Sequence, residues 1–315
     1  MIRRFGGLCF ARSGVECFRS ASPRAGGVRT ARIGKGAPGM HRLSCGHVVS
    51  EPGQTHYCSY LRLQEMLSLQ PAPEELRHPD EHLFVITHQA FELWFAQLRF
   101  DLERIVVALR DDDVPLATWL VRRCVAILKL FSPMMRVLET MSPSDFFAFR
   151  EHLAPASGTE SSQWHEVELL AGLRDEGFRR FLEAEPSGDP ERGVPSKLWT
   201  DRLEELWNRP SVASELRRLF ERRGVGPADI YVVAPEKNPH GDLMLLAEAL
   251  LDFDEEFRIW RFAHARTAQR EIGPDTEGTG HTSGVSYLDR VATGRADFFP
   301  ELWRAREELW ERRRG

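Results

Sequence analysis

The segment HPDEHLFVITHQAFELWF, residues 78–95, decides the kind of fold to expect. Its ring-bearing residues recur at helical intervals, so Phe84, His88, Phe91 and Phe95 share one face of a helix. The same pattern continues over residues 81–110. The sequence therefore predicts a long amphipathic helix that carries a histidine on an aromatic face.

Helical periodicity also runs through most of the remaining chain, and the one β-branched cluster, residues 230–233, is short. Ser142 precedes Pro143 and Asp145 in the pattern of a capped helix start. Further helices are expected over residues 60–67, 116–141, 146–153, 164–183, 241–268 and 298–313, and a pair of helices broken at Pro210 over residues 197–223. We therefore predict an all-α helical bundle, with polar loops at 154–163 and 273–284 where a site can be built.

Composition excludes several classes of protein. The chain has 315 residues, of which 42% are hydrophobic and 28% charged, as in an ordinary globular protein. No apolar run approaches the roughly 20 residues of a membrane span. Five cysteines without a CxxC pair exclude a disulfide scaffold and a zinc ribbon, and favour a reducing, cytoplasmic location. A net charge of -5 argues against nucleic acid as a partner.

Residues 1–39 differ from the rest of the chain because they carry eight basic residues and a single acid, Glu16. Such an Arg-rich, acid-poor start is typical of an organellar transit peptide, which keeps organellar import open. The alternative is that Met40 is the true initiator. In either case we expect residues 1–39 to be a basic extension and residues 40–315 to form a single domain.

A histidine also lies on an aromatic face near the C-terminal end. In LLDFDEEFRIWRFAHAR, residues 250–266, the residues Phe253, Phe257, Trp260 and His264 recur at intervals of three and four. One interpretation is a core histidine that bonds a carbonyl. The other is an axial ligand to haem, which favours a neutral imidazole on an apolar wall.

His88 can be interpreted in more than one way. Glu92 follows it by four residues, a spacing at which a His/Glu pair can bind a metal, although no third ligand stands at a useful spacing. Arg150, four residues after Phe146, is either a solvated arginine or a clamp for a carboxylate. The loops 156–158 and 278–280 offer backbone N–H groups, but neither follows a strand or carries the lysine of a phosphate-binding loop.

Six segments, in the same order along the chain, resemble blocks of the tryptophan 2,3-dioxygenase family. They are HYCSYLRL (56–63), HPDEHLFVITHQAFELWF (78–95), MSPSDFFAFREHLAPASG (141–158), IWRFAHARTAQREIG (259–273), GTGHTSGVSYL (278–288) and FFPELWRAR (298–306). The resemblance implies an all-α homotetramer with one haem b per subunit. It also implies cleavage of the indole C2–C3 bond of L-tryptophan by O2, giving N-formyl-L-kynurenine, in tryptophan catabolism through the kynurenine pathway.

The resemblance implies roles for single residues. His264 would be the proximal ligand of the haem iron, and His88 the distal, catalytic histidine beside the indole N–H. Arg150 would pair with the substrate carboxylate, and Thr279 would touch the substrate ammonium and carboxylate as its loop closes. Further residues would bind substrate or border the haem: Phe84 against the indole, Ser157 and Gly158 on the distal side, and Tyr57, Tyr60 and Leu61 in a neighbouring subunit's site.

The sequence departs from the family at the pocket. Phe146 stands where the family commonly has a tyrosine whose hydroxyl helps to hold the substrate carboxylate, and the segments 158–161, 164–166 and 278–282 also differ. Two alternatives therefore stay open. One is a relative that adds a single oxygen atom to a substituted tryptophan, giving an oxindole in natural-product biosynthesis. The other is a non-catalytic protein that binds or senses haem.

Overall fold

The computed structural model describes residues 41–42, 48–49, 56–154, 156–184, 198–232, 237–276, 288 and 297–314. The expected basic extension, residues 1–39, lies outside these ranges. The chain divides into two compact units, Met1–Leu67 and Ser68–Gly315. The single domain expected from residue 40 stays a prediction.

The first unit contains short elements. Strands β1 (His41–Arg42) and β2 (Val48–Val49) pair antiparallel, with His41 opposite Val49. Two short helices follow, α1 (Tyr57–Tyr60) and α2 (Leu63–Leu67). The sequence predicted a single short helix over residues 60–67, and α2 covers most of that range. The side chains of Tyr57 and Tyr60 are exposed.

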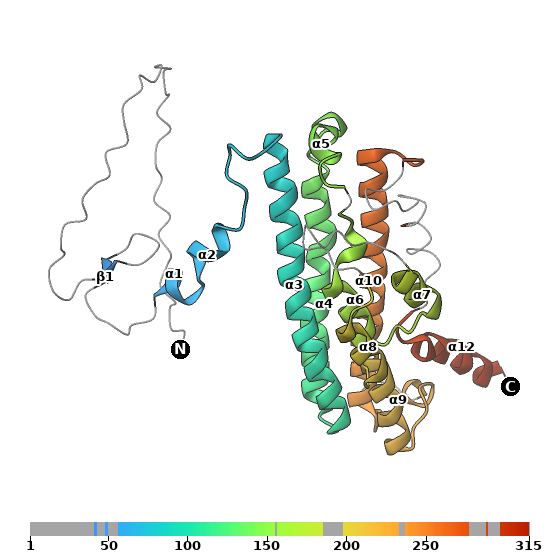
Figure 1. Ribbon diagram of the computed structural model, residues 1–315. Helices are drawn as coiled ribbons and strands as arrows, with labels where there is room; N and C mark the ends of the chain where they lie inside the picture. Colours follow the sequence, from blue (N-terminus) through green and yellow to red (C-terminus); the bar gives the residue numbers. More distant parts are fainter. Residues whose placement is uncertain are drawn as a thin grey trace, which may run out of the picture. The chain divides into compact units, whose positions relative to one another are not determined.

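The second unit is a helical bundle, which confirms the predicted all-α fold. Its three long helices are α3 (Pro79–Arg110), α4 (Val114–Leu138) and α10 (Gly241–Ile272), and α4 packs along both of the others (Figure 1). Helix α6 (Ser162–Ala171) and helix α9 (Val212–Arg223) pack against α3. The other elements in the described part of this unit are α5 (Pro143–Arg150), η1 (Gly158–Glu160), α7 (Glu176–Ala184), α8 (Asp201–Asn208), η3 (Asp229–Tyr231) and α12 (Pro300–Arg314).

Capping residues determine where the helices of the pocket begin. The backbone N–H of Asp80 donates to His78 Nδ1, with Pro79 in the first helical turn, so α3 begins slightly before the expected residue 81. The Ser142 hydroxyl accepts from the N–H of Asp145 at 3.1 Å, which confirms the predicted cap of α5. Helix α5 therefore starts at Pro143 rather than at Phe146.

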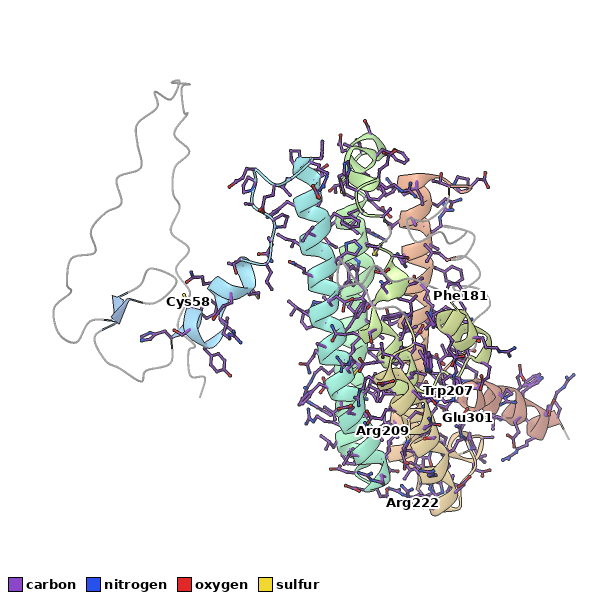
Figure 2. All side chains as sticks on the ribbon, in the orientation of Figure 1. Cys58, Phe181, Trp207, Arg209, Arg222 and Glu301 are labelled. Atoms are coloured by element: carbon purple, nitrogen blue, oxygen red, sulfur yellow. The ribbon has the colours of Figure 1, made fainter. Side chains whose placement is uncertain are left out.

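One expected helix is two helices. The segment 164–183 was predicted to be continuous, but the helix ends at Gly172, whose φ of 136° is unfavourable for any side chain. The chain turns there, and Arg174 then donates to the carbonyl oxygens of Leu206 and Trp207 at the end of α8. Trp207 is labelled in Figure 2. Periodicity could not reveal this break because both halves carry apolar residues at helical spacing.

The β-branched cluster at residues 230–233 does not form a strand in its described part. Asp229–Tyr231 is a short 3-10 helix, and Ile230 is buried. Four residues without a partner strand cannot satisfy their backbone groups as a sheet, so a helical turn is the favoured conformation.

An aromatic core joins the three long helices. The ring of Phe131 on α4 lies 5.1 Å from that of Phe91 and 5.8 Å from that of Trp260, between centroids. The ring of Phe257 stacks on Trp164 of α6 at 4.4 Å. Such edge-on and stacked pairs stabilise a core by about 1 kcal/mol each beyond burial. Facing stripes of α3 and α10 are thereby held in register.

A buried carboxylate attaches the C-terminal helix to the bundle. Asp254 of α10 accepts hydrogen bonds from the backbone N–H groups of Phe298 and Phe299 and from the indole N–H of Trp303. A buried carboxylate is tolerated because these donors replace water. The contact holds the start of α12 against the middle of α10.

Replacement of Gly172 by alanine tests the break between α6 and α7. The added Cβ would stand 2.5 Å from the Cβ of Ala213 in addition to the unfavourable φ. We expect the Gly172→Ala variant to lose about 2–4 kcal/mol of unfolding free energy in urea denaturation. Gly224→Ala is the matched control, because its added Cβ would meet no atom within 4 Å. It should lose only about 1–2 kcal/mol from the positive φ, and equal losses would contradict the packing argument.

Candidate active site

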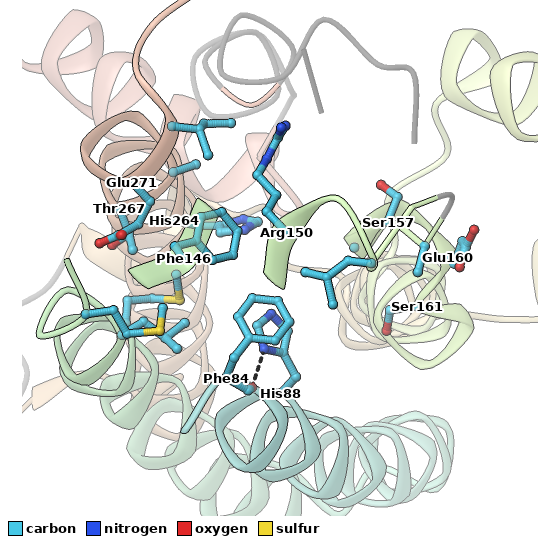
Figure 3. Close-up of a pocket in the computed structure, with 18 of the residues that line it drawn as sticks. Phe84, His88, Phe146, Arg150, Ser157, Glu160, Ser161, His264, Thr267 and Glu271 are labelled. Carbon is cyan, nitrogen blue, oxygen red and sulfur yellow. Dashed lines mark hydrogen bonds between the residues drawn. The ribbon is translucent and has the colours of Figure 1, made fainter. Parts of the chain in front are cut away.

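A largely apolar cavity of about 550 Å³ lies within the second unit, between α3, α4, α5, η1 and α10 (Figure 3). This volume is in the range of ligand and cofactor pockets, roughly 300–1,000 Å³. The sequence-predicted residues that border it are Phe84, His88, Phe146, Arg150, Ser157, Gly158 and His264. The structure thus brings together residues that lie far apart in the sequence.

His264 faces the cavity from α10, and its ring stacks on Trp260 with an interplanar angle of 14°. Desolvation, aided by the nearby His88, lowers its pKa to about 4, so the imidazole is neutral at physiological pH. Within the described part of the chain its ring nitrogens make no hydrogen bond, whereas a structural core histidine is expected to bond a carbonyl. A neutral imidazole with an available lone pair is the form that binds a metal.

His88 projects into the same cavity from α3, and its tautomer follows from its hydrogen bond. Nδ1 lies 2.7 Å from the carbonyl oxygen of Phe84, which can only accept, so Nδ1 is the donor. Although the ring is open to the cavity, the surrounding protein desolvates it and lowers its pKa. Nε2 of this neutral ring is therefore a hydrogen-bond acceptor for a group in the cavity.

The donor set and the apolar lining of the cavity fit a haem. His264 is a neutral nitrogen ligand on an aromatic wall, and Met135, Leu138 and Met141 add apolar surface for a planar macrocycle. The backbone at Gly158 borders open space, because a Cβ there would meet no atom within 4 Å. These features match the preference of haem for one imidazole in otherwise apolar surroundings.

Three residues could contact an aromatic amino acid beside such a group. The ring of Phe84 lies 5.8 Å from that of Phe146, between centroids, and both border the cavity. Phe146 and Arg150 are one turn apart on α5, so their side chains share a face of the helix. A guanidinium beside aromatic rings suits a substrate with a carboxylate at one end and an apolar ring at the other.

The interpretation of His88 and Glu92 as a metal pair receives no support from the contacts of Glu92. Its carboxylate accepts from the Ser161 hydroxyl at 2.6 Å and from the Gln163 amide at 2.8 Å. Among the described residues no group of three His, Cys, Asp or Glu side chains is placed to hold a metal ion. Glu92 thus fixes the loop around η1 against α3.

Residues 164–166, one of the departures from the family pattern, are built into the protein interior. Trp164 belongs to the aromatic core, and His165 Nε2 donates to the carbonyl oxygen of Thr159 at 2.8 Å. Glu166 pairs with Arg99 at 2.8 Å. These contacts hold the turn that follows Ser157 and Gly158, so the segment supports the cavity wall from behind.

Two acidic residues of the cavity wall were missed by the sequence argument, Glu160 and Glu271. Burial is the main cause that raises the pKa of each. Glu271 follows His264 by two helical turns and therefore lies on the same face of α10. That spacing was a sign in the sequence that Glu271 faces the same way as His264. A carboxyl group on a helix that is partly exposed is, however, usually solvated.

Several predicted site residues cannot be placed in the cavity. Thr279 and its glycine neighbours lie outside the described residues. Tyr57, Tyr60 and Leu61 belong to the first unit, where their side chains are exposed. Their roles stay predictions.

Across the described helices, none combines the length and apolar character that a bilayer-spanning segment requires.

Comparison with known proteins identifies the family that this chain resembles. The sequence profile of the family described as Tryptophan 2,3-dioxygenase matches residues 41–184 and 202–309. A Tryptophan 2,3-dioxygenase of Herpetosiphon aurantiacus is 35% identical over 260 residues, covering 80% of this chain and 98% of the relative. Proteins of the same name from Xanthomonas campestris pv. campestris and Bradyrhizobium sp. are 32% and 35% identical over 277 residues. Each alignment covers 82% of this chain, and 88% and 94% of those relatives respectively.

The matched residues include every sequence-predicted side chain that borders the cavity, and the relatives are matched over most of their length. Profile, identity and coverage support the same assignment, and the chain belongs to the tryptophan 2,3-dioxygenase family, a family of haem-dependent enzymes.

Proposed function

We propose that this chain is a haem-dependent dioxygenase that cleaves the indole C2–C3 bond of L-tryptophan with O2, giving N-formyl-L-kynurenine. Both oxygen atoms of O2 enter the product, so the reaction consumes no separate reductant. The observation that carries the proposal is the arrangement of His264, His88 and Arg150 around one apolar cavity. The activity named for its relatives agrees with this chemistry.

The proposed cofactor is haem b, one per subunit, with His264 as the axial ligand of its iron. The neutral imidazole and the apolar wall support this assignment. Haem supplies the redox chemistry with O2, for which protein side chains are unsuited.

The protein's own residues bind and orient the substrate in this proposal. His88 Nε2 accepts the indole N–H, because Nδ1 is already bonded to the Phe84 carbonyl. Phe84 and Phe146 pack against the indole and exclude water, and Arg150 binds the carboxylate. Thr279 would complete the site from its loop, and Ser157 and Gly158 would border the haem. Fixing the substrate in this way places C2 and C3 within reach of O2.

A homotetramer is proposed on the basis of apolar side chains at the surface of the bundle. Helices α3 and α4 expose Ile86, Leu93, Trp94, Phe100, Val107, Leu116, Trp119, Leu130 and Val137. So many exposed apolar groups on neighbouring helices are typical of a subunit interface. Tyr57, Tyr60 and Leu61 would then reach a neighbouring subunit's site.

We further propose a cytoplasmic location and a role in tryptophan catabolism through the kynurenine pathway.

The product distinguishes the proposal from its alternatives. We expect the reduced, haem-loaded protein, mixed with L-tryptophan and O2, to yield a product heavier by two oxygen atoms that absorbs as a formylkynurenine. Mass spectrometry and absorbance measure this directly. A gain of one oxygen, or turnover only with a substituted tryptophan, would indicate the oxindole-forming alternative. No change of the haem spectrum on adding tryptophan would indicate a haem sensor.

Loss of the proposed iron ligand should release the cofactor. We expect His264→Ala to retain less than about a tenth of the haem of the unmodified chain after gel filtration, because haem loses its axial bond to the protein. The Soret absorbance per mole of protein measures the content. His152→Ala is the matched control, since His152 is exposed and lies outside the cavity wall. Full haem retention by His264→Ala would exclude this ligand.

Restoring a hydroxyl at the altered position should tighten substrate binding. Phe146 shares a helix face with Arg150, so a hydroxyl on its ring can donate to the substrate carboxylate. A hydrogen bond to a charged group contributes about 1.5–3 kcal/mol. We therefore expect Phe146→Tyr to lower the KM for L-tryptophan at least roughly tenfold in steady-state kinetics. The neighbouring exposed ring gives the control, Phe147→Tyr, which should leave KM unchanged. An unchanged KM in Phe146→Tyr would place the carboxylate elsewhere.

A further inference from the structure

Glu271 is a buried carboxyl in the cavity wall, and one of its oxygens has no hydrogen-bond partner among the described residues. The residue is 8% exposed, and its side chain borders the same cavity as His264 and Arg150 (Figure 3). Oε2 is buried, and within the described ranges it accepts no hydrogen bond. Buried carboxyl groups are normally paired or hydrogen-bonded. A ligand in the cavity could donate the hydrogen bond that Oε2 does not receive from the described residues.

The polar groups next to Glu271 on α10 already have another partner. Arg270 donates to Glu139 Oε2 at 3.0 Å, and the Thr267 hydroxyl donates to Glu139 Oε1 at 2.9 Å. Both oxygens of the Glu139 carboxylate therefore accept hydrogen bonds from side chains of α10. Burial raises the pKa of Glu271, the neighbouring Arg270 guanidinium acts against this, and repulsion by Glu139 adds to it.

We propose that Glu271 binds the ammonium group of the amino-acid substrate while Arg150 binds its carboxylate. This inference rests on the proposed function, because it names a further substrate contact in the same cavity. An amino acid carries both charges on one carbon, and the two side chains of opposite sign border one cavity from α5 and α10. A charge-assisted hydrogen bond to the ammonium would supply the donor that Glu271 lacks.

This arrangement accounts for selectivity toward amino acids. The rest of the wall is apolar enough to accept many indoles, but an indole without an ammonium group would leave the Glu271 carboxyl buried and unpaired. Leaving a buried polar group without its partner is strongly unfavourable, which is how sites reject analogues that lack one group. Glu271 is thus a specificity-determining residue in this proposal.

Three probe ligands test the inference by binding alone. L-tryptophan carries both charges, tryptamine only the ammonium, and indole-3-propionate only the carboxylate. Each is titrated into the haem-loaded protein, and the Kd is read from the change of the haem spectrum. Glu271→Gln keeps the size of the side chain and removes its charge. We expect it to raise the Kd of L-tryptophan and tryptamine about ten- to a hundredfold and to leave that of indole-3-propionate unchanged or lower.

Two further variants show whether the effect on Kd is specific to the ammonium group. Arg150→Ala should show the converse pattern, weakening the ligands that carry a carboxylate and leaving tryptamine unaffected. Glu255→Gln is the matched control for the loss of a carboxylate on α10, because Glu255 is exposed and is absent from the cavity wall among the described residues. It should alter none of the three Kd values.

The outcomes separate this inference from the proposed function. If the unmodified protein converts tryptophan but Glu271→Gln changes all three Kd values equally, or none, the ammonium contact is wrong and the enzyme assignment stands. If the unmodified protein neither converts nor binds tryptophan, the proposed function itself fails. Selective weakening of the two ammonium ligands supports the contact.

Discussion

The aromatic contact between the three long helices is the constraint on which the site depends. Phe91 of α3 and Trp260 of α10 both pack against Phe131 of α4. These rings fix the two outer helices in one register, because a shift by a residue would turn each aromatic stripe away from the core. The next residues on the same stripes, His88 and His264, then face one cavity without needing a direct contact.

The apolar wall that follows from this packing also sets the charges in the cavity. Desolvation keeps both imidazoles neutral, so His264 can act as a ligand and His88 as an acceptor. A basic side chain, Arg150, and an acidic one, Glu271, border the same cavity. Groups of opposite sign in an apolar site suit a ligand that is itself a zwitterion, which connects the packing of the core to the choice of substrate.

Prediction from sequence succeeded where one local pattern was sufficient. The long helices and the cap at Ser142 follow from periodicity and capping chemistry, and the structure confirms them. The break at Gly172 was missed because it depends on Ala213 and on the end of α8, which are distant in sequence. Glu271 was missed for a similar reason, since a carboxyl on a helix gives no local sign that it is buried.

The sequence by itself determined the all-α class, the two histidine-bearing aromatic stripes and the resemblance to one family, because these are properties of local spacing and of ordered motifs. Only the tertiary structure decided that the His264 ring faces the cavity and that Nδ1 of His88 is committed to a carbonyl. It also decided that Glu271 Oε2 is buried without a hydrogen bond from any described residue. Those facts depend on which groups from other helices surround each side chain. Burial and hydrogen bonding are set by neighbours in space, and a linear sequence does not specify those neighbours.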